Sequence, residues 1–261
     1  MSNFGKRTRS ILCRILACVG VGMLIACAGA PRDEQLASPR SLVAPYDTLQ
    51  GEVLFAFAPL NNESGTTEVD VGMVTDRLVA AAEEVQGVRT VPLNRTLQAM
   101  RALNMTRVTS PEDAMRLTQA MGVDAIIVGS ITNYDPYTPV LGMTLGLYSR
   151  PGSLQPAGGR GEVDPRSLTS ATTDRGPSGT RFSQTPGVVV SGNLDGKNHQ
   201  VLQDVKTFAR GRAREQSALR WERYIASMPL FCEFAAYRMM DELMQREWIR
   251  LGRVQARVED K

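Results

Sequence analysis

After residue 50, apolar and polar positions alternate in two different periods along the chain. Residues 53–58 are apolar without interruption and stop at Pro59, which is the length of a buried strand. Between Val69 and Gln86, apolar residues recur at helical spacing, and Gly87 ends the pattern. Short strands that alternate with helices predict an α/β domain.

The clearest strand of the sequence lies at residues 124–131. Ile126, Ile127 and Val128 make it apolar on both faces, as a central strand between two helix layers is. A helix should precede it, beginning after Ser110 as N-cap. Further strands are predicted at 88–92, 140–148 and 188–194, and further helices at 93–103 and from about residue 198. We therefore expect a single sheet of about four to five strands covered by helices.

A long final helix is predicted from Pro229 onward. Its apolar residues recur at steps of three and four: Leu230, Phe234, Tyr237, Met240, Met244, Trp248 and Leu251. Such a stripe usually covers a sheet. The alternative is a subunit interface, with Tyr237 and Trp248 in the contact.

Two other stretches lack a regular apolar period. Residues 150–187 contain five prolines and seven glycines among polar residues, which predicts a long disordered insertion. Residues 27–50 are expected to form a tether, so that the domain spans 51–251 with the insertion inside it. Residues 252–261 are expected to form a polar tail.

The amino terminus has the composition of a signal peptide. Lys6, Arg7, Arg9 and Arg14 form a basic start, and a 12-residue apolar run at 15–26 follows. This run is too short to span a bilayer and suits the core of an export signal. We therefore assign residues 1–26 to a signal peptide.

The run ends in Leu24-Ile25-Ala26-Cys27, which resembles the lipobox of bacterial lipoproteins. The resemblance implies cleavage before Cys27 and attachment to a membrane through lipid on that cysteine. Because Ala28 stands where an aspartate favours inner-membrane retention, the resemblance favours an outer-membrane protein that faces the periplasm. Two alternatives stay open: cleavage after Ala30 in Ala28-Gly29-Ala30, which would release a soluble protein, and a signal that is not cleaved.

Charge and cysteine content change once the signal is removed. The chain has 30 basic and 27 acidic residues, and the signal holds four of the basic ones, which leaves 26 against 27. A nearly neutral chain gives no reason to expect a nucleic-acid partner. Of four cysteines, only Cys232 would remain unlipidated in the mature chain, so we expect no internal disulfide and a buried, inert thiol there.

No sequence motif of an enzyme is present, and we expect neither catalytic, cofactor-binding nor metal-binding residues. His199 is the single histidine, and a solvent-exposed position at a helix start is favoured over a catalytic dyad with Cys232. A zinc site would need more His or Cys ligands than the mature chain has. Basic residues around Arg210 and Arg212, with Lys206 and Arg214, suit the end of a helix better than they suit anionic lipid.

The order of elements resembles a family of envelope proteins. Strand and loop at Val53–Asn62, the segment Gly122–Tyr134, the strand Val188–Leu194 and the final helix carry the resemblance. The family includes the curli-secretion channel lipoprotein, the lipoprotein activators of peptidoglycan synthases and the amino-terminal domain of the Tol-system periplasmic protein. The resemblance implies a structural or assembly factor in secretion or cell-wall machinery that binds other envelope proteins and can form homo-oligomers.

The alternative within this resemblance is a subunit of a ring-shaped channel of the curli type. Membrane-spanning hairpins need about ten residues that alternate between apolar and polar. Residues 150–187 show no such alternation. A domain without a pore therefore fits the sequence better.

A partner surface is expected at the ends of two adjacent strands, because sites on open α/β sheets favour strand ends. The loop 61–67 and the turn 135–138 would both lie there. We therefore single out Asn61, Asn62, Asp135 and Tyr137 as the candidate partner surface.

Overall fold

The computed structural model describes residues 41–48, 51–156, 185–210, 212 and 219–259, which all belong to one compact unit, Ser38–Lys261. This unit contains a six-stranded sheet with the order β3-β1-β4-β5-β6, in which β2 pairs with β4 beyond the end of β1. The strands are β1 (Val53–Phe57), β2 (Asn61–Asn62), β3 (Val88–Thr90), β4 (Ala125–Asp135), β5 (Val140–Ser149) and β6 (Val188–Asp195).

The sheet has a parallel part and an antiparallel part that meet at β4. On one side β3, β1 and β4 run parallel, with Phe55 opposite Ala125 and Phe57 opposite Ile127. On the other side β4, β5 and β6 run antiparallel, with Ile127 opposite Leu147. The parallel connections pass through helices, as crossovers between parallel strands must.

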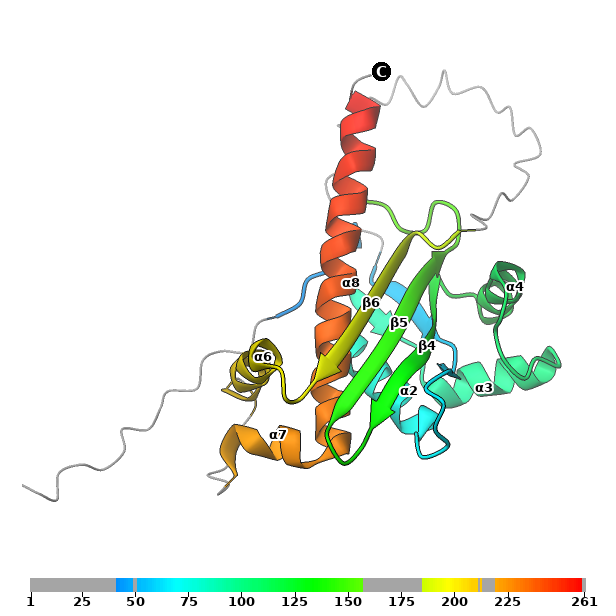
Figure 1. Ribbon diagram of the computed structural model, residues 1–261. Helices are drawn as coiled ribbons and strands as arrows, with labels where there is room; N and C mark the ends of the chain where they lie inside the picture. Colours follow the sequence, from blue (N-terminus) through cyan, green and yellow to red (C-terminus); the bar gives the residue numbers. More distant parts are fainter. Residues whose placement is uncertain (1–40, 49–50, 157–184, 211, 213–218, 260–261) are drawn as a thin grey trace, which may run out of the picture. The chain divides into compact units, whose positions relative to one another are not determined.

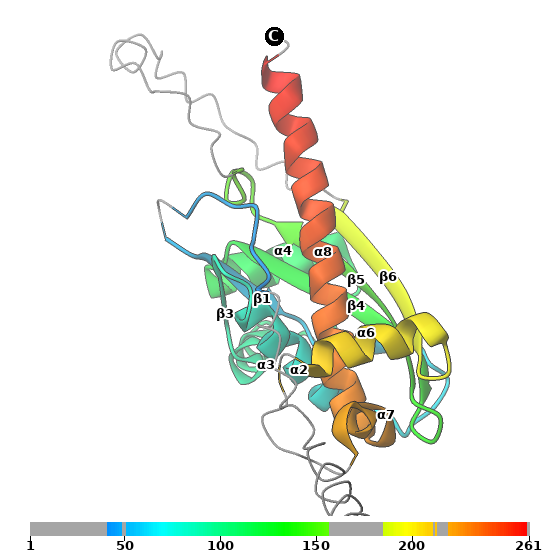
Figure 2. The same ribbon diagram turned by 90° about the vertical axis from the view of Figure 1, so that its left-hand side faces the viewer.

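Helices cover the two faces of the sheet unequally (Figure 1 and Figure 2). On one face α2 and α8 pack against each other and the sheet, with α6 beside them. On the other face α3 and α4 cover β1 and the start of β4. The helices are α2 (Val71–Glu83), α3 (Leu93–Ala102), α4 (Pro111–Met121), α6 (His199–Arg210), α7 (Arg223–Ala226) and α8 (Met228–Glu259).

Two hydrophobic clusters follow from this layering. Phe55, Phe57 and Ile127 point into the larger cluster with α2 and α8, whereas Ala56 and Ile126 point into the smaller cluster with α3 and α4. Alternate residues of one strand therefore enter different cores, which explains why β1 and the start of β4 are apolar on both faces.

Local signals set the helix ends where the sequence indicates them. The Ser110 hydroxyl accepts a hydrogen bond from the Asp113 backbone N–H, and the Asp113 carboxylate accepts one from the Ser110 N–H, which forms a capping box at α4. Gly122 ends the helix at φ +65°. At α2, the Asp70 carboxylate accepts from the Met73 N–H.

The predicted fold class is confirmed: one sheet of mixed strands is covered by helices, and a long helix ends the chain. Three details differ from expectation. The loop after β1 contains the short strand β2, β4 continues to Asp135, and α8 continues to Glu259 through most of the expected tail.

Two expected boundaries also differ. Residues 41–48, which we expected within the tether, pack on the domain, with Leu42, Ala44 and Tyr46 buried. Of the expected insertion, residues 150–156 form a hydrogen-bonded turn, while 157–184 lie outside the described residues. The interpretation of 27–50 as a tether missed this packing because only three alternating apolar residues, Leu42, Ala44 and Tyr46, carry it.

The final helix covers the sheet as expected, with one correction. Phe234, Met240 and Met244 are buried, but Trp248 is 50% exposed. Phe231, Ala235, Met239 and Leu243 form the centre of the buried stripe instead. These residues are also apolar in the sequence, so the apolar pattern alone did not determine which side of the helix faces the sheet.

Candidate functional site

The candidate surface residues lie at one end of the sheet. Asn61 and Asn62 form β2 and pair with Ser130 and Ile131 of β4. Asp135, the last residue of β4, follows Ile131 by four positions, or roughly 13 Å along a strand. The structure thus brings the loop after β2 and the β4–β5 turn to the same end of the sheet (Figure 1). We refer to Asn61, Asn62, Asp135 and Tyr137 as the strand-end surface.

Asp135 shapes the β4–β5 turn. Its carboxylate accepts hydrogen bonds from the Thr138 hydroxyl (2.7 Å), the Tyr137 N–H (2.9 Å) and the Thr138 N–H (3.2 Å). These donors, the Thr138 hydroxyl first, hold the pKa of Asp135 below its usual value. The turn presents Tyr137, whose side chain is 86% exposed. Within this turn, Tyr137 is therefore the side chain most available to a partner.

The two asparagines have different roles. Asn61 donates through Nδ2 to the Val108 carbonyl (3.2 Å), which fixes the loop before α4 against β2. Asn62 is exposed and organises its own loop, because Oδ1 accepts from the Ser64 N–H and Nδ2 donates to the Thr66 carbonyl (2.7 Å). Asn61 is thus tied into the domain, and Asn62 holds its own exposed loop in place.

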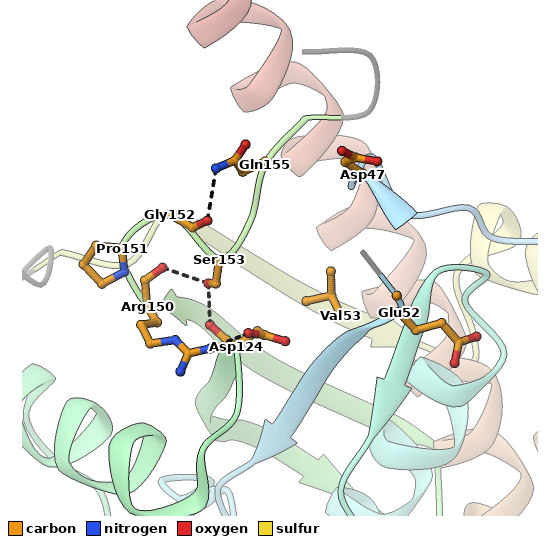
Figure 3. A pocket seen from close by; sticks show the side chains of 10 residues that line it. Asp47, Glu52, Val53, Asp124, Arg150, Pro151, Gly152, Ser153 and Gln155 are labelled. Carbon is orange, nitrogen blue, oxygen red and sulfur yellow. Dashed lines mark hydrogen bonds and ion pairs between the residues drawn. The ribbon is translucent and has the colours of Figure 1, made fainter. Parts of the chain in front are cut away.

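A polar cleft of about 350 Å³ lies at the amino-terminal ends of β1 and β4, at the other end of the sheet from the strand-end surface (Figure 3). Arg150 pairs with Asp124 (2.7 Å), and the other carboxylate oxygen of Asp124 accepts from the Leu54 N–H (3.0 Å). The Ser153 hydroxyl lies 2.8 Å from the carbonyls of Asp124 and Arg150. These polar groups bind one another and fix the turn after β5, so their hydrogen bonds serve to hold this end of the fold together.

The residues considered for catalysis are not brought together. Cys232 is fully buried in α8, and this burial raises the pKa of its thiol to about 12. His199 is exposed at the start of α6. A neutral, inaccessible thiol and a solvent-exposed imidazole do not form a dyad.

The basic cluster late in α6 is explained by packing. The Arg212 guanidinium lies 4.2 Å from the Phe208 ring centroid and pairs with Glu84. The Lys206 ammonium stands 4.7 Å from the centroid of the Trp221 ring. Arg214 lies outside the described residues. Tyr237, which is partly buried, also packs here, with its ring centroid 5.1 Å from that of Phe208.

A buried ionic cluster joins the start of the domain to α8, and sequence analysis missed it. Glu247 is fully buried, and its carboxylate accepts two hydrogen bonds from Arg250 (2.8 and 2.7 Å) and one from the Tyr46 hydroxyl (3.3 Å). Burial, and then the Glu247 charge, raise the pKa of Tyr46 well above its usual value. Trp248 donates through Nε1 to the Val43 carbonyl (3.0 Å). The spacing Glu247–Arg250 on one helix was the available signal.

The described residues contain neither a metal-binding cluster nor a membrane-spanning helix. Over 41–48, 51–156, 185–210, 212 and 219–259, no three His, Cys, Asp or Glu side chains are grouped to hold a metal ion. Within the same ranges, no helix has both the length and the apolar content that a membrane span requires. Cys27, the expected lipidation site, lies outside them.

Comparisons with known proteins give weak similarities. No family model matches the chain, and no curated protein matches it. Among solved structures, lipoprotein GNA1162 from Neisseria meningitidis is 19% identical at a TM-score of 0.31, covering 37% of this chain and 72% of its own. The LpoB C-terminal domain from Escherichia coli is 16% identical at a TM-score of 0.30, covering 42% and 76%.

A third solved structure matches over a longer part of the chain. The hypothetical protein CT253 from Chlamydia trachomatis is 11% identical at a TM-score of 0.31, covering 80% of this chain and 100% of its own. These values do not establish membership of a family. The curli-type channel, our alternative from the sequence, gains no support from them, and β5 and β6 have one face buried beneath α8.

Proposed function

We propose that this chain is an exported bacterial lipoprotein, held to the outer membrane by lipid on Cys27 and facing the periplasm. Its α/β domain acts as a non-enzymatic assembly factor that binds other envelope proteins in secretion or cell-wall machinery. The observation that carries the proposal is Leu24-Ile25-Ala26-Cys27 directly after a basic start and a short apolar run.

The strand-end surface is the proposed binding site for those envelope proteins. Its support is the exposed Tyr137 ring, on a turn that is held by three hydrogen bonds to the Asp135 carboxylate and by the β4–β5 ladder. Tyrosine supplies a large contact area at a small cost in side-chain entropy, which suits it to the centre of a protein interface.

The anchor is tested by Cys27→Ser in the full chain. Each buried lipid CH₂ contributes roughly 0.8 kcal/mol, so two or three acyl chains hold a protein firmly. The variant should move from the membrane fraction to an unprocessed or soluble form. Mass spectrometry of the mature wild type should show diacylated Cys27 at the amino terminus; a lipid-free protein starting at Gly29 or later contradicts the proposal.

The binding surface is tested by co-purification from membranes, with the captured proteins identified. Tyr137→Ala should weaken capture without a change in melting temperature, because no side-chain bond of Tyr137 is broken. Changing Asn61, Asn62, Asp135 and Tyr137 together should reduce it further. A matched control replaces exposed residues on α3 and α4, Gln98, Arg116 and Gln119, with alanine. Full capture by the folded quadruple variant excludes this surface.

A further inference from the structure

Exposed apolar side chains gather around the carboxyl-terminal half of α8. Trp248 and Ile249 are 50% and 55% exposed on the helix. Val43 is 47% exposed and accepts the Trp248 hydrogen bond through its carbonyl. Ile249 lines a cleft of about 610 Å³ between α8 and the edge strand β6. We refer to Val43, Trp248 and Ile249 as the α8 apolar patch.

Arginines border this patch. Arg246, Arg250 and Arg253 line the cleft beside Ile249. Arg246 pairs with Glu242 and Arg250 with Glu247, so these five groups carry a net charge of about +1, three cations against two anions. The surface therefore combines an indole, aliphatic side chains and one excess positive charge. This composition is typical of surfaces that lie in the interface of a bilayer.

The start of the described domain brings the patch close to the proposed lipid. Ser41 is two residues before Val43 and 14 residues after Cys27. A chain of that length spans at most about 50 Å when fully extended. The Tyr46–Glu247 and Trp248–Val43 hydrogen bonds fix residues 43–46 on α8. Whatever path residues 28–40 take, Ser41 stays within this distance of a lipidated Cys27.

A second copy of the chain is a poorer fit for the patch. A stable protein interface buries about 800 Å² on each partner, mostly in well-packed contact. The three patch residues are each about half covered already. A bilayer needs no complementary pocket, and lipid on Cys27 would add to the free energy with which the patch itself binds the bilayer.

We propose that the α8 apolar patch lies on the surface of a phospholipid bilayer that carries anionic headgroups, with Trp248 and Ile249 at the level of the headgroups. This proposal rests on the lipid anchor proposed above and adds an orientation to it. Met228 and Trp248 are separated along α8 by about 30 Å. The strand-end surface lies toward the α7 end of α8 (Figure 1), so it would face away from the membrane, toward its partners.

The chain's two tryptophans provide an internal test, because Trp221 lies near α7 and Trp248 lies in the patch. The lipidated mature protein is placed in vesicles of phosphatidylcholine with brominated acyl chains and about one quarter phosphatidylglycerol. With Trp221→Phe, bromine should quench the remaining Trp248 fluorescence by roughly half or more, as for an interfacial indole. With Trp248→Phe, the remaining Trp221 should be quenched hardly at all.

A further substitution separates the patch from the anchor. Ile249→Asp in the Trp221→Phe chain should relieve most of the quenching, while the protein still floats with the vesicles through its lipid. If the protein floats and Trp248 is no more quenched than Trp221, the patch does not lie on lipid. A detergent-resistant dimer that Ile249→Asp dissociates would also overturn the proposal, in favour of a second copy.

Failure of the anchor gives a different result. If the chain carries no lipid, it does not float, and the same two single-tryptophan chains are titrated with an excess of the brominated vesicles. Quenching confined to Trp248 then supports the patch without the anchor. Absence of quenching at high vesicle concentration contradicts the patch independently of Cys27.

Discussion

The parallel strands β1 and the start of β4 differ from the antiparallel strands β5 and β6 in how helices cover them. At Ile126 and Ile127, adjacent residues of β4 point to opposite faces and both are fully buried. In β5 and β6 only one face is buried, beneath α8, where Leu145 pairs with Val190. The other face carries small polar residues such as Thr144 and Ser191, whose hydroxyls lie 2.9 Å apart.

This difference shows which part of the sheet is left for function. Two helix layers leave no surface on β1 and the start of β4. The antiparallel strands β5 and β6 have helices mainly on one face, which leaves the other face open. Beside them, β4 continues past its buried segment to Asp135. Asp135 of the strand-end surface therefore lies at the end of this extension.

The largest effect is expected from a charge in the doubly covered part. Ile127→Asp would bury a carboxylate without a partner, which costs several kcal/mol and approaches the whole stability of a domain. We expect no cooperative unfolding transition by circular dichroism. Thr144→Asp on the open face of β5, and Gln119→Glu on α4, should each stay within about 1 kcal/mol of the wild type. A folded Ile127→Asp protein would show that β4 is not central.

The same difference decides how far the sequence could predict the fold. Where both faces are covered, continuous apolar runs such as 53–58 and 124–131 identify the strands. Beyond Ile131, β4 reads as a polar loop because one face is open, so its extension was missed. The strand β2 has two residues and pairs only through the backbone, which leaves no pattern in side chains.

The candidate site was predictable in position but not in detail. Strand ends of an α/β sheet were expected to meet, and the loop of Asn62 and the turn of Asp135 lie at one end of the sheet. The bonds of Asn61 to Val108 and of Tyr46 to Glu247 join residues 47 and 201 positions apart, and single-sequence periodicity carries no information on such pairs. The rotation of α8, which exposes Trp248, depends on the same long-range packing.

A large difference in reactivity is expected between the thiol of Cys232, which α8 buries against the covered face of the sheet, and a thiol on the open face of β6. The burial that raises the pKa of Cys232 to about 12 leaves almost no thiolate, so at pH 8 it should react with a maleimide about 10³-fold more slowly than in urea. A variant with Cys13, Cys18 and Cys27 all changed to serine keeps Cys232 as its only thiol, whether or not the signal is cleaved. In that background, Ser191→Cys with Cys232→Ser should react at nearly the unfolded rate. Equal rates for both thiols would contradict the one-sided covering.

A matched pair of glycines tests the packing of the same two faces. A Cβ at Gly129 would lie 2.2 Å from the Thr144 carbonyl oxygen, so Gly129→Ala should cost about 1–3 kcal/mol. A Cβ at Gly146, on the open face, would meet nothing closer than 3.5 Å. Gly146→Ala should therefore lie within about 0.5 kcal/mol of the wild type. Urea unfolding of both variants measures the difference, and equal losses would argue against a closed and an open face.

The smallest effect is expected at Asp135, where the hairpin turns. Hydrogen bonds, first from the Thr138 hydroxyl, lower the pKa of Asp135 in the folded protein. A lowered pKa means that the carboxylate stabilises the fold above the unfolded pKa of about 3.9, and that this stabilisation is lost as the pH falls through the folded value. Asp135→Asn should therefore lower the melting temperature slightly at neutral pH, and the gap to the wild type should close as the pH falls below about 4.

Thr138→Val is the matched change for this titration, because it removes the donor that contributes most to the lowered pKa. It should reduce the neutral-pH gap between Asp and Asn at position 135. Calorimetric scans from neutral pH down to about pH 3 give the comparison. A gap that stays constant over this range would mean that the Asp135 charge does not hold the turn. Tyr137 would then be presented by the β4–β5 ladder alone, and only its own substitution should affect capture of partners.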